Sequence, residues 1–88
     1  MPEAYIVDAI RTPVGKKKGS LSGIHPADLG AHPLQALFER TDMDPAVVED
    51  VVYGCVDTIG GQAGDIARSC WLVAGLPEEV PGTTIDRQ

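Results

Sequence analysis

The sequence predicts an α/β fold, in which a mostly parallel sheet carries helices on its faces. Segments rich in β-branched residues alternate with segments of helical periodicity, in the order β-α-β-α-β. The stretches between successive strands are long enough for parallel crossovers. The 88 residues, of which 43 % are hydrophobic and 23 % charged, have the composition of one small globular domain or of part of a larger one.

The first strand is expected over residues 5–10, which are mainly β-branched and aromatic. Pro13 and Gly15 end it, because proline cannot donate to a β-ladder and glycine favours irregular backbone. A loop over residues 11–23 follows, which is long for a passive connection. Its three lysines, residues 16–18, are interpreted as a solvated stretch, and a patch that contacts phosphate is the alternative.

A helix is expected over residues 26–40. Pro26 suits the first helical position, and Asp28 complements the positive end of the helix dipole. Pro33 removes one helical hydrogen bond and clashes with the carbonyl of Leu29, so we expect a kink or a break there. One face, with Leu34 and Phe38 beside it, is predicted to be buried: Leu29, Pro33, Ala36, Leu37 and Arg40.

A short helical turn and a second strand are expected next. Asp44 is placed to cap the turn, which Pro45 begins and which runs through Val48. The apolar run over residues 51–56 is nearly continuous. Such a run predicts a strand that is buried on both faces of a parallel sheet.

A second helix is expected over residues 65–74. Gly75 supplies the left-handed residue after it, Leu76 a hydrophobic contact, and Pro77 the stop. Residues 83–86 then resemble the start of a third strand. The predicted buried stripe of the second helix is Ile66, Ala67, Cys70, Val73 and Ala74.

Residues 58–64 form a glycine-rich turn between strand and helix, a common place for nucleotide-binding loops. A dinucleotide fingerprint would need glycine at position 59, where Ile59 stands. A Walker loop would need Gly-Lys-Ser/Thr where Gly64 and Asp65 stand, and the Asp65 carboxylate would repel a phosphate. A tight turn with close backbone packing is therefore favoured, and phosphate binding is the alternative.

The cysteines and histidines do not form a recognisable metal or redox site. Cys55 and Cys70 are predicted to be small core hydrophobes, because neither belongs to a Cys-x-x-Cys or Cys-His arrangement. His25 and His32 lack the spacing and the carboxylates of a metal site. We expect His25 to shape the start of the first helix and His32 to face solvent.

The charge balance argues against several classes of partner. A net charge of −6, from 7 basic and 13 acidic side chains, disfavours nucleic acid. No apolar run approaches the roughly 20 residues that span a bilayer, and the first residues lack the cationic start of a signal peptide. We therefore expect a cytoplasmic protein with no membrane or nucleic-acid partner. Asp86 and Arg87 are expected to pair with each other or with a partner chain.

Several stretches, in this order and spacing, resemble the N-terminal part of a thiolase, an acyl-CoA acyltransferase. Three positions depart from that pattern. Asp65 stands where thiolases often have Asn, Arg87 stands where a small or polar residue is common, and Pro33 is unusual inside the helix. The matching stretches cover essentially the whole chain: residues 10–15 (IRTPVG), 19–21 (GSL), 27–29 (ADL), 52–56 (VYGCV), 67–68 (AR), 74–77 (AGLP) and 83–88 (TTIDRQ).

The resemblance implies a thiolase-like layered α/β fold, of which residues 1–88 would be an incomplete N-terminal domain. It also implies that the nucleophilic cysteine comes immediately after Gln88, so no catalytic, cofactor-binding or metal-binding residue is assigned within the chain. In a thiolase this cysteine takes an acyl group from a coenzyme A thioester and passes it on, and the enzyme thereby makes or cleaves 3-ketoacyl-CoA.

The same resemblance implies coenzyme A thioesters as substrates, no further cofactor and no metal. It implies a homodimer or homotetramer that acts in fatty acid metabolism, with the 88 residues inactive on their own. The alternative takes these 88 residues as the finished molecule, a non-catalytic α/β fragment or interaction module.

Overall fold

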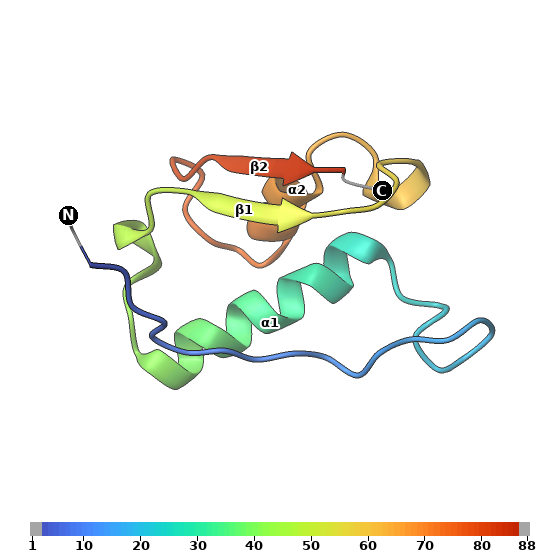
Figure 1. Cartoon of the computed structure of the whole chain (residues 1–88), viewed down its shortest axis with the longest axis horizontal. Coiled ribbons are helices and arrows are strands. Elements are labelled where there is room, and N and C mark those ends of the chain that lie inside the picture. Colours follow the sequence, from blue (N-terminus) through green and yellow to red (C-terminus); the bar gives the residue numbers. More distant parts are fainter. Residues whose placement is uncertain (1–2, 87–88) are drawn as a thin grey trace.

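The computed structural model describes residues 3–86 as two α-helices and two strands, joined by loops and short 3-10 turns (Figure 1). The α/β class is confirmed, and the two helices and the last two strands lie within two residues of their expected bounds. In chain order the elements are α1 (Pro26–Thr41), η1 (Pro45–Val47), β1 (Val51–Gly54), η2 (Gly60–Gln62), α2 (Ile66–Val73) and β2 (Gly82–Ile85).

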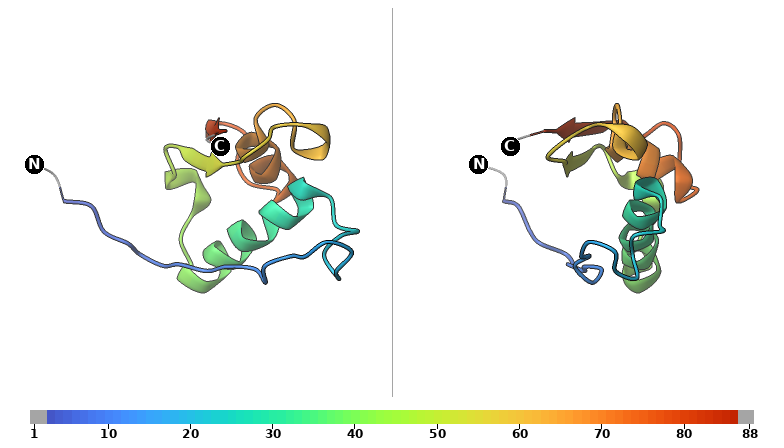
Figure 2. Two further views of the ribbon diagram at one scale, coloured as in Figure 1. Left: turned by 45° about the vertical axis from the view of Figure 1, so that its right-hand side comes forward. Right: turned by 90° about the vertical axis from the view of Figure 1, so that its right-hand side faces the viewer.

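The two strands form a parallel pair. Val51 lies opposite Gly82, and Gly54 opposite Ile85. The pairing extends one residue further, because the N–H of Cys55 donates to the carbonyl of Ile85 at 2.9 Å. α2 lies in the crossover between the strands and packs against both, and α1 packs against α2 (Figures 1 and 2). The layers are therefore sheet, α2 and α1.

Both ends of α1 are capped, and the helix is uninterrupted. At its start, Nδ1 of His25 accepts from the N–H of Ala27 at 3.1 Å, as expected of His25. At its end, Asp42 is left-handed with φ 54° and donates its N–H to Phe38. The expected break at Pro33 is wrong, because α1 runs through this residue. The packing of the flanking turns on α2 offsets the one hydrogen bond that proline removes.

The face of α1 that contacts the core differs from the predicted one. Leu29 and Leu37 were predicted to lie on the buried face. They are only half-buried, and they line grooves beside the N-terminal segment. Two alanines lie at the crossing with α2, where small side chains allow close approach. The residues that are buried or contact the core follow helical spacing: Ala27, Ala31, Leu34 and Phe38.

α2 ends in the motif that the sequence predicted. Gly75 has a φ of 78° and donates its N–H to the carbonyl of Leu72 at 3.0 Å. The N–H of Leu76 bonds to the carbonyl of Trp71 at 3.3 Å, and the Leu76 side chain packs against the core. These two bonds form a Schellman motif, which satisfies the last carbonyls of the helix.

Trp71 lies at the centre of the core, although it was not part of the predicted stripe. Its ring meets Phe38 edge-on with the centroids 5.7 Å apart, and its indole N–H donates to the carbonyl of Pro77 at 2.6 Å. Val73, which the stripe included, is 49 % exposed. Three members of the stripe are buried as predicted: Ile66, Ala67 and Cys70.

The strand expected over residues 5–10 is not present. This segment runs alongside α1, away from the two-stranded sheet (Figure 2), and Asp8 forms an ion pair with Arg40 at 3.3 Å. Ile6 is 90 % exposed. A strand needs a neighbour for its backbone hydrogen bonds, and the sheet described within residues 3–86 consists of β1 and β2 alone. β-propensity without such a neighbour does not make a strand.

The sheet buries one face only, which corrects the prediction of a strand buried on both faces. Val51 is buried against Ala67 and Trp71, whereas the next residue, Val52, is 62 % exposed. The burial of β2 alternates in the same way, and Ile85 lies on the exposed side. No element within residues 3–86 covers that second face.

Candidate functional site

The carboxyl ends of β1 and β2 lie side by side, and this is the edge at which open α/β sheets bind ligands. α1 begins and η2 lies near the same end of the molecule (Figure 1). An open groove of about 310 Å³ lies between these elements, lined by both cysteines together with Tyr53 and Gln62. It is the best-placed candidate for a functional site within the described residues.

The glycine-rich turn shapes one side of this edge by close packing. A Cβ on Gly61 would lie 2.9 Å from Cδ of Pro26 and 3.3 Å from Nε2 of His25. Gly60 and Gly64 have φ values of 58° and 73°, which favour glycine. These contacts support the prediction of a tight turn over that of a phosphate loop.

The two cysteines at this edge differ in burial, and each lies beside a backbone carbonyl oxygen. Cys70 is fully buried as predicted, its burial raises the pKa of its thiol, and its Sγ lies 3.9 Å from the carbonyl of Pro26. Cys55 is half-buried, and its thiol donates to the carbonyl of Asp57 at 3.3 Å. Burial favours the protonated thiol of Cys70, whereas a cysteine nucleophile reacts as the thiolate.

Tyr53 ties β1 to α1 beside the groove. Its hydroxyl donates to the carbonyl of Gly30 at 2.9 Å. Burial, and to a smaller extent the nearby Cys70, raises the pKa of Tyr53 to about 12. The phenol therefore stays neutral and acts as a hydrogen-bond donor, not as a base.

Asp65 and Thr84 link the start of α2 to β2, a contact that sequence reasoning missed. The Thr84 hydroxyl donates to Oδ1 of Asp65 at 2.7 Å and accepts from the N–H of Ala67 at 3.0 Å. The same Oδ1 accepts from the N–H of Arg68 at 3.3 Å, so Asp65 also caps the helix. The only sequence signal was that Asp65 is a capping residue type at the expected helix start.

The other candidate residues lie away from this edge or outside the described part. His32 is exposed, as expected. The three lysines, residues 16–18, are exposed in a turn closed by a bond from Gly19 N–H to the Lys16 carbonyl. Asp86 is exposed, and its predicted partner Arg87 lies outside the described residues. Within residues 3–86, no group of three or more acidic, histidine or cysteine side chains is placed to hold a metal.

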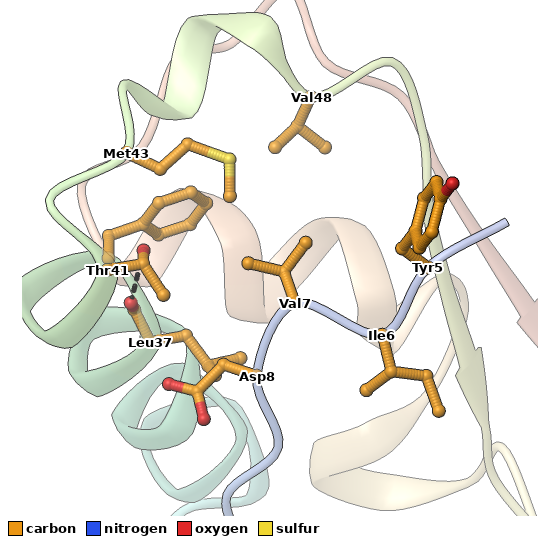
Figure 3. Close-up of a pocket in the computed structure, with 9 residues that line it drawn as sticks. Tyr5, Ile6, Val7, Asp8, Leu37, Thr41, Met43 and Val48 are labelled. Atoms are coloured by element: carbon orange, nitrogen blue, oxygen red, sulfur yellow. Dashed lines mark hydrogen bonds between the residues drawn. The ribbon is translucent and has the colours of Figure 1, made fainter.

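A second groove, of about 290 Å³, lies between the N-terminal segment and the C-terminal half of α1 (Figure 3). Val7, Leu37 and Met43 are among the apolar side chains that line it. The hydroxyl of Thr41 is turned to the helix and donates to the carbonyl of Leu37 at 2.8 Å. The groove is mainly apolar, and the Asp8 carboxylate at its side pairs with Arg40.

Comparison with known proteins identifies the sequence pattern. A family model described as "Thiolase, N-terminal domain" matches residues 4–88. The chain is 66 % identical over 88 residues to steroid 3-ketoacyl-CoA thiolase FadA6 of Mycobacterium tuberculosis, covering 100 % of this chain and 22 % of that protein. It is 49 % identical to beta-ketoadipyl-CoA thiolase of Acinetobacter baylyi, covering 99 % of this chain and 22 % of that protein.

A third relative is matched over a similar share of its length. The chain is 44 % identical to 3-oxoadipyl-CoA/3-oxo-5,6-dehydrosuberyl-CoA thiolase of Escherichia coli K12, over 99 % of this chain and 22 % of that protein. The chain thus spans about a fifth of the length of these curated relatives. Within residues 3–86, no helix is both long enough and apolar enough to cross a membrane.

Proposed function

This chain belongs to the thiolase family, and on that premise we propose that its 88 residues are the first part of the N-terminal domain of a longer acyl-CoA C-acyltransferase. The observation that carries the proposal is the match over essentially the entire chain to proteins of which it covers only 22 %. A shared segment of this identity supports a shared reaction type. The whole protein is the natural polypeptide that contains these residues.

The exposed surface supports a larger body. The chain has 6606 Å² of accessible surface, whereas a folded monomer of this mass has about 5,000 Å². Large apolar side chains contribute to the exposed surface, including Val52 and Ile85 on the open face of the sheet and Ile6 in the N-terminal segment. Apolar surface of this extent is covered in the finished molecule in most soluble proteins.

In the proposed enzyme the nucleophilic cysteine directly follows Gln88, which is the position that the resemblance to thiolases implies. Its thiolate attacks the keto carbon of a 3-ketoacyl-CoA and forms a cysteine thioester as the carbon–carbon bond breaks. The departing two-carbon fragment takes up a proton and leaves as acetyl-CoA. The thiol of coenzyme A then attacks the cysteine thioester, which releases the shortened acyl-CoA and the free cysteine. The role of residues 3–86 is structural, since β2 leads the chain toward the carboxyl edge of the sheet. No metal and no cofactor beyond coenzyme A thioesters is needed.

The relatives narrow the proposed substrate. The relative at 66 % identity is named as acting on a steroid 3-ketoacyl-CoA, and that at 49 % on beta-ketoadipyl-CoA. We therefore rank a 3-ketoacyl-CoA with a bulky steroid-derived acyl group first, and a short dicarboxylic acyl group second. The proposed setting is a cytoplasmic homodimer or homotetramer in the degradation of acyl chains.

An intact-mass measurement, with peptide mapping across Gln88 and a thiolysis assay, tests this proposal. We expect a mass several times 9.3 kDa, a cysteine directly after Gln88, and cleavage of a 3-ketoacyl-CoA that depends on coenzyme A. Replacing that cysteine by serine abolishes the cleavage. A 9.3 kDa polypeptide without turnover favours a non-catalytic interaction module instead.

A further inference from the structure

We infer that Asp65 and Thr84 are positioning residues: together they fix the end of β2, and through it the residue that follows Gln88. The inference rests on the proposed function, because it concerns where the nucleophile of that reaction lies. Neither residue is placed to touch substrate, since the Thr84 side chain is turned toward the start of α2.

β2 and the residues just before it are attached to α2 at alternate positions, 80, 82 and 84. The Arg68 guanidinium donates to the carbonyl of Val80 at 2.6 Å. Gly82 lies so close that a Cβ on it would be 2.9 Å from the backbone nitrogen of Arg68. Thr84 makes the last of these contacts, so it is the one nearest to Gln88.

The last contact depends on two side chains, each of which makes two hydrogen bonds. The Thr84 hydroxyl uses its proton on Oδ1 of Asp65 and a lone pair on the N–H of Ala67. One carboxylate oxygen thus holds both the strand and, through Arg68, the first turn of the helix. Removing either side chain leaves polar groups unpaired. It also loosens β2 from α2 beyond Gly82, where the ladder to β1 is the attachment that remains.

The distance to the proposed nucleophile is short. A chain extends at most about 3.6 Å per residue, so the residue after Gln88 lies within about 18 Å of Thr84. Loss of the contact shifts the strand end without removing any group that binds substrate. Because a displacement of about 1 Å at a reacting group can cost up to about 100-fold in rate, the loss should appear in kcat and not in KM.

The test compares variants of the whole protein in steady-state thiolysis, together with thermal melts. Thr84→Val keeps the shape and removes the hydroxyl, and Asp65→Ser keeps a helix cap but is too short to reach Thr84. Thr84→Ser keeps the hydroxyl and Asp65→Asn keeps an Oδ1, so each of these variants retains the hydrogen bond between positions 84 and 65. Ser69→Ala is the matched control, because its hydroxyl bonds only to the backbone carbonyl of Asp65, at 3.3 Å.

We expect Thr84→Val and Asp65→Ser each to lower kcat by about tenfold or more with KM within about twofold. Thr84→Ser, Asp65→Asn and Ser69→Ala should have a kcat near that of the parent protein. The double variant, Thr84→Val with Asp65→Ser, should lose no more kcat than the more severely affected single variant. If Thr84→Val does not fold, Asp65→Ser decides the question. A parent-like kcat in Asp65→Ser, or a loss of kcat in Asp65→Asn as large as that in Asp65→Ser, overturns this inference and leaves the proposed function standing. An inactive parent protein overturns the proposed function as well.

Discussion

Cys70 occupies the space that a side chain on Gly30 would need. The absent Cβ lets α1 and α2 approach until the thiol of one helix lies against the backbone of the other. The Tyr53 hydroxyl bonds to the carbonyl of the same glycine, so α1, α2 and β1 meet at one point. This junction forms the floor of the groove at the carboxyl edge of the sheet.

Gly30→Ala should destabilise the protein, because the new methyl group would overlap Sγ of Cys70. Overpacking of this kind costs about 1–3 kcal/mol. Urea unfolding measures the effect, and Gly23→Ala is the matched control, since nothing lies within 4 Å of its added Cβ. Adding Cys70→Ala to Gly30→Ala should recover part of the loss. Equal midpoints for the two alanine variants would refute the overlap.

Tyr53 should make stability fall at alkaline pH. Its pKa is raised from 10.0 to about 12 in the folded state. Between these two pH values the unfolded state has lost the phenol proton that the folded state keeps. The contribution of Tyr53 to the free energy of unfolding is therefore fully present below this window and declines as pH rises through it. Tyr53→Phe removes this dependence, which denaturant unfolding at several pH values measures. An unchanged alkaline slope in Tyr53→Phe would contradict the assignment.

Gly82→Ala should separate β2 from α2. A Cβ at this position would lie 2.9 Å from the Arg68 nitrogen and 3.2 Å from the Ala67 carbonyl carbon, and backbone cannot move aside as a flexible side chain can. We expect a loss of about 1–3 kcal/mol in unfolding free energy. Gly54→Ala, on the neighbouring strand with no atom within 4 Å, should be milder. A larger loss of unfolding free energy in Gly54→Ala than in Gly82→Ala would show that β2 and α2 are not tightly packed at Gly82.

The isolated 88-residue chain should self-associate or remain partly unfolded. Val52 is 62 % exposed and Ile85 52 % exposed on a sheet face that no element within residues 3–86 covers. Uncovered apolar faces and open strand edges promote association. Light scattering after size exclusion, with binding of a hydrophobic dye, measures this. A monomer that melts cooperatively would count against a larger parent body.

Local signals in the sequence were sufficient to place both helices and the last two strands. The start of α1 follows from Pro26 and His25, and the end of α2 from Gly75 and Leu76, because capping depends on residues that are adjacent along the chain. The tight turn at η2 was predictable for the same reason. Each of these features is decided within one or two turns of backbone.

Burial could not be predicted in the same way, because it depends on what packs alongside. Residues 5–10 have strand composition but no strand partner within the described chain, so they run along α1 instead. Trp71 is buried because Phe38 and the carbonyl of Pro77 receive it. The contact between Asp65 and Thr84 joins residues 19 positions apart, and no local pattern indicates it.

Trapping the acyl-enzyme tests the central claim most directly. The whole protein is incubated with an acyl-CoA, quenched in acid, digested and mapped by mass spectrometry. We predict one acyl group as a thioester on the cysteine that follows Gln88, with Cys55 and Cys70 unmodified. Acylation of Cys55 or Cys70, or of no cysteine, would contradict the claim that these residues support a thiolase nucleophile directly after Gln88.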